Sequence, residues 1–298
     1  MNQGASEWLD RLIADARAAD GQPPFSDQSL IDVRSGSRRL LAISDVAAAI
    51  VSDTEAELVV HPDSRGRGHG SALVSTILRS AEPGFLVWAH GDHPAARALA
   101  SRNGFEPVRR LLQLRVHLGE LSSGSDGSME TQPMSNAGEV SMPQQATYSI
   151  RSFVDSDADE WLALNARAFA NHPEQGSVTR EDLDATMAEP WFDASAFLVM
   201  RDGPTMIGYC WLKIEPSSAL GNEPGELYVV GVDPDHQGRG IGRALVLAGL
   251  AELERRGIRE SSLYVEADNT PALKLYQAMG YSEYSVDIQY ALTRFTSR

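Results

Sequence analysis

Apolar and polar positions follow the same pattern in both halves of the chain. In the second half, short runs of strand-type apolar residues alternate with longer segments in which apolar residues recur every three or four positions. These patterns predict strands over 147–153, 196–202, 205–214, 225–234, 261–268 and 281–292, and helices over 155–170, 180–189, 238–257 and 271–280. Asp155 or Ser156 caps the first of these helices, Gly257 ends the third, and Pro271 begins the last.

The first half repeats this order with fainter early strands. Its patterns predict helices over 6–19, 68–81 and 94–104, and strands over 38–44, 54–62, 85–91 and 105–118. Two units in which strands and helices alternate in the same order indicate an internal duplication. We therefore expect an α/β protein with two mixed-sheet domains in tandem.

A change of composition separates the two halves. Residues 119–146 are rich in Ser, Gly, Pro, Met and Gln, and they show no apolar period. We expect a first domain over 1–118, a linker over 119–146 and a second domain over 147–298. Each domain is long enough for a hydrophobic core of its own.

Composition limits the environment in which the protein works. The single cysteine, Cys210, excludes an internal disulfide framework, and in its strand-like run it reads as an inert buried thiol. The chain has neither the charge pattern of a secretory signal at its start nor an apolar run of about 18 residues. These features predict a cytoplasmic protein that does not enter a membrane.

Negative charge gathers in the second half. The net charge is −15 overall, −1 for residues 1–118 and −10 for residues 147–298. Nucleic acid, which needs a basic footprint, is therefore a poor partner. A small cationic substrate such as an amine suits the second half better, although solubility alone also explains an acidic surface.

A glycine-rich turn follows a predicted strand in each half. The two stretches are VVGVDPDHQGRGIGRALV, which begins at Val229, and LVVHPDSRGRGHGSALV, which begins at Leu58. Glycines spaced two apart let backbone N–H groups approach a phosphate, and the following helix adds the positive end of its dipole. Neither turn has the P-loop or the Rossmann spacing. Tight helix–strand packing would be the alternative use of the glycines.

These turns carry a family resemblance. Gln237–Gly242 and Arg65–Gly70 both match the Q/R-x-x-G-x-G/A signature of the GNAT acetyltransferases, and Asp268–Tyr281 is similar to their second signature. The resemblance covers both halves apart from the linker. It implies two GNAT-like domains and acetyl-CoA as the acetyl donor, with the pyrophosphate bound on the glycine turn.

A narrower resemblance points to one branch of that family. The segments 165–176, 225–234, 263–269 and 275–292 closely resemble the mycothiol synthases of actinobacteria. Those enzymes acetylate the cysteine amine of cysteinyl-glucosaminyl-inositol and so form mycothiol. The resemblance implies this small-molecule substrate; composition and spacing could not supply an inositol sugar. We expect a monomer.

The resemblance also assigns acetyl-CoA contacts in both domains. In the second domain the backbone of the strand before the turn would hold the pantetheine arm, and one of its N–H groups would polarise the thioester carbonyl. The expected contacts there are Val230, Gly231, Val232, Gln237, Gly238, Arg239, Gly240, Ile241, Gly242, Arg243, Asn269, Thr270, Pro271, Ala272, Leu273 and Lys274. In the first domain they are Leu58, Val59, Val60, Arg65, Gly66, Arg67, Gly68, His69 and Gly70.

Only the second domain has both residues expected to catalyse. Amide formation from a thioester needs a base for the amine and an acid for the leaving thiolate. Glu226 and Tyr276 suit these two roles. Alignment of the two glycine turns places Thr54 opposite Glu226, and alignment of the later helices at their Gly-Phe and Gly-Tyr ends places Ala100 opposite Tyr276. We therefore expect the first domain to be non-catalytic.

A shifted register would change that alignment. If a bulge shifts the register of one strand, the nearby Glu55 or Glu57 could take the place of Thr54 opposite Glu226. The alternatives for Glu226 and Tyr276 themselves are a solvated strand-end acid and a core aromatic.

The family pattern further implies an acceptor site. Its residues would be Asp27, Glu174, Lys213, Glu226 and Tyr264. A polyhydroxylated acceptor needs many hydrogen-bonding groups, and a carboxylate can hold its ammonium. The plain alternatives are a loop acid for Glu174 and a strand-edge cation for Lys213.

No metal site is expected. His61, His90 and His93 lack the spacing of metal ligands and read as surface or turn histidines. Two other functions stay open at this stage: acetylation of another amine, such as an aminoglycoside or a peptide N-terminus, and a non-catalytic acetyl-CoA-binding module.

Overall fold

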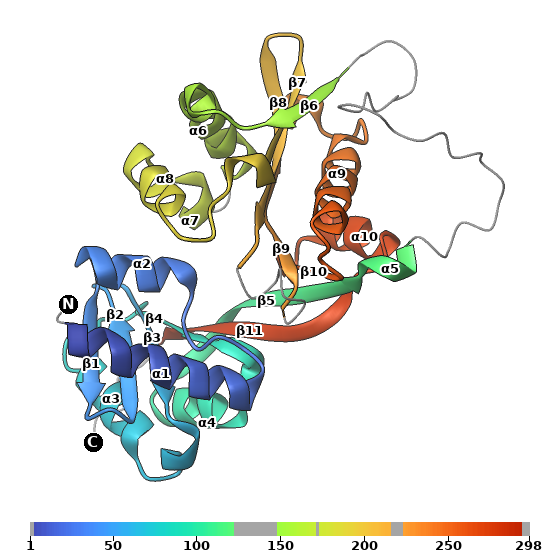
Figure 1. The fold of residues 1–298 in the computed structure, drawn as a ribbon. Coiled ribbons are helices and arrows are strands. Elements are labelled where there is room, and N and C mark those ends of the chain that lie inside the picture. Colours follow the sequence, from blue (N-terminus) through green and yellow to red (C-terminus); the bar gives the residue numbers. More distant parts are fainter. Residues whose placement is uncertain (1–2, 122–147, 171–172, 216–222, 294–298) are drawn as a thin grey trace. The chain divides into compact units, whose positions relative to one another are not determined.

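The structure, a computed structural model, describes residues 3–121, 148–170, 173–215 and 223–293 and forms two compact units (Figure 1). Unit 1 consists of residues 1–113, 265–270 and 283–298, and unit 2 of residues 114–264 and 271–282. This grouping by contacts differs from the domain boundaries expected from the sequence, which stay a prediction. Most of the expected linker, 122–146, lies outside the described residues.

Unit 1 is a mixed sheet covered by helices. Its helices are α1 (Gln3–Asp20), α2 (Asp27–Ser35), α3 (His69–Ile77) and α4 (Pro94–Arg102), with short 3-10 turns η1 (Pro62–Ser64) and η2 (His90–Asp92). Its strands are β1 (Arg39–Ile43), β2 (Ala47–Val51), β3 (Glu55–Val60), β4 (Leu86–Ala89), most of β5 (Phe105–His117) and β11 (Ser282–Leu292). The strand order is β1-β2-β3-β4-β11-β5, and β3 and β4 run parallel.

Strand β2 is buried along its whole length because both faces of the sheet are covered. Ala47, Ala49 and Val51 belong to a core with α3, whereas Ala48 and Ile50 belong to a second core with α1 and α2. A strand with two buried faces has no polar alternation. The sequence pattern therefore missed β2, and it also missed α2.

Unit 2 is a second mixed sheet. Its strands are β6 (Ser149–Ser152), β7 (Phe197–Asp202), β8 (Thr205–Lys213), β9 (Gly225–Val232) and most of β10 (Glu260–Glu266), which lie in the order β10-β9-β8-β7-β6. Its helices are α5 (Leu118–Leu121), α6 (Ala158–Ala168), α7 (Pro173–Gly176), α8 (Arg180–Met187), α9 (Ile241–Arg255) and α10 (Thr270–Ala278), whose first residue belongs to unit 1. Among the described helices, none is long and apolar enough to cross a membrane.

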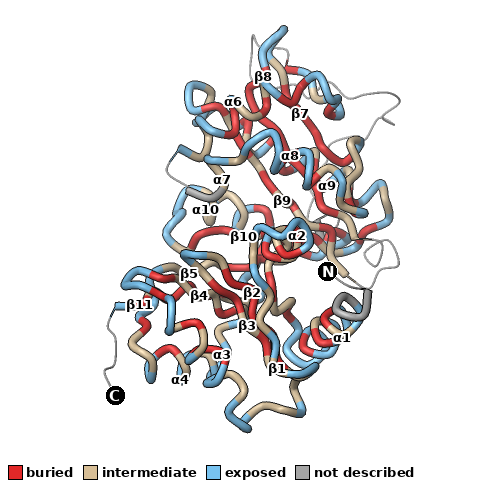
Figure 2. The backbone as a smooth tube through the Cα atoms, turned by 90° about the vertical axis from the view of Figure 1, so that its left-hand side faces the viewer, coloured by how far each residue is buried: buried red, intermediate tan, exposed pale blue. Residues whose placement is uncertain are grey.

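Aromatic rings fill one side of the unit 2 sheet. Trp161 of α6 is 1% exposed and meets the rings of Phe197, Tyr209 and Trp211 at centroid distances between 5.5 and 5.8 Å. On the opposite side Gly249 of α9 lies so close to β8 and β9 that an added Cβ would approach neighbouring side chains at 2.8–3.2 Å. Every residue of β8 after Thr205 is buried as a result (Figure 2).

The last strand of the chain belongs to unit 1. Strand β11 pairs antiparallel with β4, so that Ile288 faces Ala89 and Ala291 faces Leu86. It lies between β4 and β5 in the strand order. The central part of the first sheet is thus built from both ends of the sequence.

Candidate functional site

Strand β9 carries a bulge next to the expected catalytic glutamate. Trp211 of β8 pairs with Val229, and the next residue, Leu212, pairs with Leu227, so Tyr228 is an extra residue in β9. A bulge of this kind turns side chains and opens the local ladder, and bulges are frequent near active sites.

Strands β9 and β10 then separate. Over these two fully described strands, parallel pairing joins only Gly225 with Ser261 and Glu226 with Ser262. The rest of β9 has an edge that β10 does not pair with. Such an edge can take an extended amide chain by strand addition, as the pantetheine arm of a CoA ester requires.

The glycine turn follows β9 directly. Gly238 and Gly240 have φ angles of 73° and 81°, and Gly240 is the N-cap of the 15-residue helix α9. An added Cβ on Gly238 would meet nothing within 4 Å, so the turn is open above this residue. Gln237 reaches back and donates from Nε2 to the Val232 carbonyl at 3.4 Å. The turn thus offers backbone donors at the positive end of a helix dipole.

The turn of unit 1 has the same construction. Gly66 and Gly68 have φ angles of 73° and 90°, and an added Cβ on either would meet nothing within 4 Å. Arg65 donates from Nε to the Val60 carbonyl at 3.1 Å. The third glycine serves packing instead, because a Cβ on Gly70 would approach a side chain of α4 at 3.1 Å.

Glu226 and Lys213 lie opposite each other on neighbouring strands. Their pairing is the last one of the β8–β9 ladder. Both residues lie on the same face of the sheet as Trp211, which is the face that α6 covers. Lys213 is only 8% exposed, and its Nζ lies 3.1 Å from Glu215 Oε1. Tyr264 is half-buried on β10. Three of the five expected acceptor residues therefore lie on adjacent strands of one unit.

Tyr276 is a half-buried residue on α10. Burial raises the pKa of its hydroxyl well above the usual range, and the neighbouring Cys210 adds to this shift. Its ring meets that of Tyr281 edge-on at 5.7 Å. The phenol is protonated at neutral pH, as a proton donor must be, although a raised pKa makes it a weaker acid.

The other expected contacts lie at scattered positions. Glu174 is in α7, but its side chain is outside the described part of the structure. Asp27 is the first residue of α2 in unit 1. Asn269 precedes α10, whose first turns contain Thr270, Pro271, Ala272, Leu273 and Lys274. The assignment of these residues to a ligand stays a prediction.

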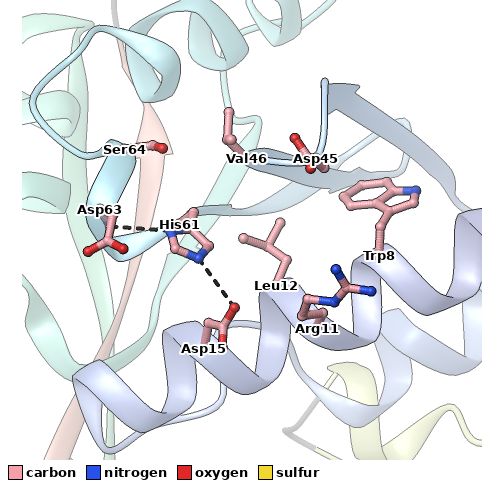
Figure 3. Close-up of a pocket in the computed structure, with 9 residues that line it drawn as sticks. All are labelled: Trp8, Arg11, Leu12, Asp15, Asp45, Val46, His61, Asp63 and Ser64. Carbon is pink, nitrogen blue, oxygen red and sulfur yellow. Dashed lines mark hydrogen bonds and ion pairs between the residues drawn. The ribbon is translucent and has the colours of Figure 1, made fainter.

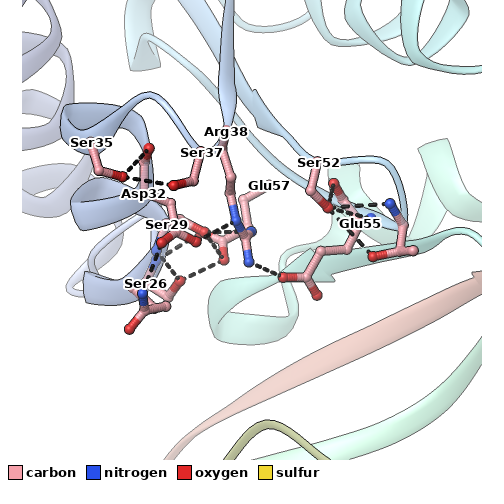
Figure 4. A network of polar contacts seen from close by, with 11 residues as sticks. Ser26, Ser29, Asp32, Ser35, Ser37, Arg38, Ser52, Glu55 and Glu57 are labelled. Atoms are coloured by element: carbon pink, nitrogen blue, oxygen red, sulfur yellow. Dashed lines mark hydrogen bonds and ion pairs between the residues drawn. The ribbon is translucent and has the colours of Figure 1, made fainter. Parts of the chain in front are cut away.

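The counterpart of Glu226 in unit 1 is Glu55 rather than Thr54. The β2–β3 pairing has no register shift, whereas β9 contains the additional Tyr228, so alignment on the glycine turn is off by one residue before the bulge. Glu55 accepts a hydrogen bond from Arg38 Nη2 at 2.5 Å, within the polar network of Figure 4. The Glu55 carboxylate is therefore engaged by an ion pair within unit 1.

A cavity of about 410 Å³ lies beside the glycine turn of unit 1. Of the nine expected acetyl-CoA contacts in this half, Leu58, Val59, Val60, Arg65, Gly66, Gly68, His69 and Gly70 line it. Arg67 is exposed and is not among the lining residues. Trp88 and His90 also line the cavity.

Helix α1 holds the unit 1 turn in place. Asp20 accepts two hydrogen bonds from Arg65, at 2.7 and 2.6 Å. One turn earlier in α1, Asp15 contacts His61 Nε2 at 3.2 Å, at the edge of a smaller hollow of about 320 Å³ (Figure 3). The His61 Nδ1 accepts the Asp63 N–H, so His61 is a turn histidine as expected.

His90 lies in the short turn η2, as expected for a turn histidine, but its side chain is largely buried, with 14% exposed. Its Nδ1 lies 2.8 Å from Asp287 Oδ2, and its Nε2 lies 3.5 Å from Glu57 Oε2. Glu57 is 2% exposed and also accepts hydrogen bonds from Ser26 and Ser29. Burial alone would lower the pKa of His90, but the two carboxylates outweigh it and raise the pKa to about 10.

Replacing His90 by Gln should destabilise the protein at neutral pH by about 3 kcal/mol, because two buried carboxylates lose their cation. The raised pKa stabilises the fold fully below about pH 6.5, and this contribution is lost as the pH rises toward about 10. The unfolding temperatures of the wild type and of His90→Gln should therefore differ most near pH 6 and become similar toward pH 10. His93→Gln is the control, since the His93 side chain caps α4 outside this triad. A pH-independent difference would contradict the charged triad.

Comparisons with known proteins define the class. The model described as Acetyltransferase (GNAT) family matches residues 159–281, and the model described as Acetyltransferase (GNAT) domain matches residues 37–107. The chain is thus an acetyltransferase with two GNAT domains in tandem, and enzymes of this class use acetyl-CoA as the acetyl donor. Both the expected fold class and the expected enzyme class are confirmed.

Sequence relatives define the branch. Mycothiol acetyltransferase of Clavibacter sepedonicus is 46% identical over 92% of this chain and 88% of its own. The protein of the same name from Thermomonospora curvata is 43% identical over 95% and 93%, and that from Streptomyces avermitilis 40% identical over 97% and 92%. The chain belongs to the mycothiol acetyltransferase family, as the sequence motifs predicted.

Solved structures agree on the fold. A tandem GNAT protein from the clavulanic acid biosynthesis pathway superposes with a TM-score of 0.69 at 17% identity, covering 100% of this chain and 97% of that one. A GCN5-related N-acetyltransferase from Sphaerobacter thermophilus gives 0.62 at 21% identity, covering 98% and 94%. At these identities the likeness establishes the tandem fold alone.

Proposed function

We propose that this enzyme transfers the acetyl group of acetyl-CoA to the cysteine amine of cysteinyl-glucosaminyl-inositol, which gives mycothiol, and that unit 2 carries the reaction. The observation that supports the acceptor is the similarity, over almost the whole chain, to relatives named for mycothiol acetylation. The single cysteine and the acidic second half suit a reducing cytoplasm and a cationic small molecule.

Glu226 would act as the base. It lies at the point where β9 leaves β10 and next to the bulge at Tyr228. The carboxylate would take the proton from the acceptor ammonium, directly or through a water, and so free the amine for attack on the thioester carbonyl carbon. A backbone N–H from Val230 to Val232 would donate to the carbonyl oxygen as charge develops there.

Tyr276 would act as the acid. When the C–S bond breaks, the leaving thiolate needs a proton, and the Tyr276 hydroxyl, which is protonated at neutral pH, would supply it. We expect direct transfer within a ternary complex and no covalent enzyme intermediate. Cys210 is fully buried and burial raises the pKa of its thiol to about 12, so it does not suit the role of nucleophile.

Both glycine turns fit the pyrophosphate of a CoA ester. In unit 1 the cavity of about 410 Å³ is bounded by that turn and by the β3 backbone that would hold the pantetheine arm. In unit 1 the counterpart of Glu226 is Glu55, which is paired with Arg38. Ala100 stands where the alignment expects the counterpart of Tyr276. Unit 1 would therefore bind acetyl-CoA without catalysing transfer.

Thiol release from acetyl-CoA with a panel of amines tests the proposal. The panel contains cysteinyl-glucosaminyl-inositol, an aminoglycoside and a peptide. Turnover with the first alone is the expected result. Turnover with one of the others would keep acetyl transfer and discard the acceptor, whereas silence with all three would favour a binding module.

A matched pair of glycine variants tests the roles of the two turns. Gly240→Val should raise the KM for acetyl-CoA about 10-fold, because a branched side chain disfavours a φ of 81° and the turn must shift. Gly68→Val places the same change at a φ of 90° in unit 1, and turnover should change less than about twofold. Equilibrium dialysis should give two bound acetyl-CoA per wild-type chain and one per Gly68→Val chain. Equal kinetic losses in both variants would contradict this division of roles.

A further inference from the structure

The indole ring of Trp191 lies against the ammonium group of Lys213, which is one of the expected acceptor-binding residues. The Lys213 Nζ lies 5.4 Å from the centroid of the Trp191 ring. Trp191 is 6% exposed, and its ring meets that of Tyr228, the extra residue of the bulge, at 5.1 Å and an angle of 61°. One ring thus contacts both the cation and the bulge that flank Glu226 in the fold.

Removal of Lys213 from water increases the stabilisation that this cation–π contact provides. A cation over an aromatic face is stabilised by about 0.5–1 kcal/mol when exposed and by about 2 kcal/mol when desolvated. Lys213 is 8% exposed, so the second case applies. The Glu215 carboxylate, 3.1 Å from Nζ, has a side chain that is itself 37% exposed.

The segment that carries Trp191 is itself anchored. Asp193, two residues on, accepts hydrogen bonds from Ser195 and lies 2.6 Å from Arg256 Nη1 at the end of α9. The Trp191 ring also packs on the ring of Trp211, at a centroid distance of 6.0 Å. The indole is therefore held by a fixed loop and by the core, and it can fix a flexible side chain.

We propose that Trp191 is a positioning residue for the acceptor, which acts by holding the Lys213 ammonium over its ring and beside Glu226. The ammonium would donate to an oxygen of the polyhydroxylated acceptor, which deepens the proposed function and rests on it. A lysine fixed in this way loses less side-chain entropy when the acceptor binds.

Steady-state kinetics of full-length variants test the proposal. Trp191→Leu should raise the KM for cysteinyl-glucosaminyl-inositol about 10- to 30-fold, the equivalent of the desolvated contact. The KM for acetyl-CoA and kcat should change less than about threefold. Trp191→Phe should restore most of the loss because it keeps an aromatic face. Phe192→Leu is the matched control, since Phe192 packs on Trp211 at 5.8 Å.

A double-mutant cycle separates positioning from general packing. Lys213→Met should raise the same KM, and adding Trp191→Leu to it should cause no further increase. Additive effects of the two changes, or a loss shared equally by both substrates, would overturn the proposal. Thermal unfolding of each variant shows whether it folds.

A second measurement separates this inference from the proposed function. Mass spectrometry after brief treatment with an amine-acylating reagent should find Lys213 protected in the wild type and modified at least 10-fold faster in Trp191→Leu. If the wild type is inactive with this acceptor, the proposed function fails, and the protection still decides whether Trp191 holds Lys213. Equal modification rates would overturn the positioning role even in an active enzyme.

Discussion

Glu226→Gln should lower kcat for acetyl transfer at pH 7 about 1,000-fold. The amide keeps the size and hydrogen-bonding capacity of the side chain but cannot take a proton, and a positioned base contributes about 10²- to 10⁴-fold. An amino-acid α-amine has a pKa of about 7.7–8.0, so at pH 7 most of the acceptor still carries the proton that the base must remove.

The pH profile is the sharper measurement. Above about pH 8 the acceptor amine loses its proton to solvent, so the gap between the wild type and Glu226→Gln should narrow steadily up to about pH 9. Glu55→Gln is the matched control, because Glu55 holds the corresponding strand position in unit 1. Its kcat should stay within about twofold of the wild type. Identical rates of wild type and Glu226→Gln across pH 6–9 would remove Glu226 from the mechanism.

Tyr276→Phe should lower kcat about 100-fold while leaving the KM values for both substrates within about threefold. The phenylalanine ring preserves the packing against Tyr281 and removes only the hydroxyl. Because burial raises the pKa of Tyr276 well above 10, the phenol is protonated throughout the range from about pH 6 to 9. The loss should therefore be independent of pH, in contrast to that of the glutamate variant.

Tyr281→Phe provides the control for this experiment. Tyr281 is buried and also has a raised pKa, and its hydroxyl lies 2.7 Å from the Ser261 hydroxyl inside unit 2. Its removal should reduce stability by about 1 kcal/mol and leave kcat nearly unchanged. Equal losses of kcat in the two variants would mean that the tyrosines act through structure rather than through proton donation.

Local chemistry made the cofactor turns predictable. Left-handed backbone at Gly66, Gly68, Gly238 and Gly240 needs glycine, and a helix follows at once, so a short stretch of sequence contains the whole signal. The same holds for the elements with a clear period, such as α9 and β9, which the structure confirms with boundaries shifted by a few residues.

Other features of the site depend on contacts between residues that are far apart in the sequence, so the sequence did not predict them. Asp287 meets His90 across 197 positions of sequence, and no spacing rule connects them. The bulge at Tyr228 exists only in relation to β8, so alignment by sequence placed Thr54 where the register places Glu55. Trp191 reads as an ordinary core aromatic until its ring is found over Lys213.

The late position of β11 has a consequence for biosynthesis. The first sheet has β11 between β4 and β5, although this strand is the last one translated. At a translation rate of about 5–20 residues per second, synthesis of the roughly 180 residues from Gln113 to Leu292 takes about 10–40 s. During that time β4 and β5 lack the strand that lies between them in the finished sheet, and unpaired strand edges of this kind favour aggregation of a nascent chain.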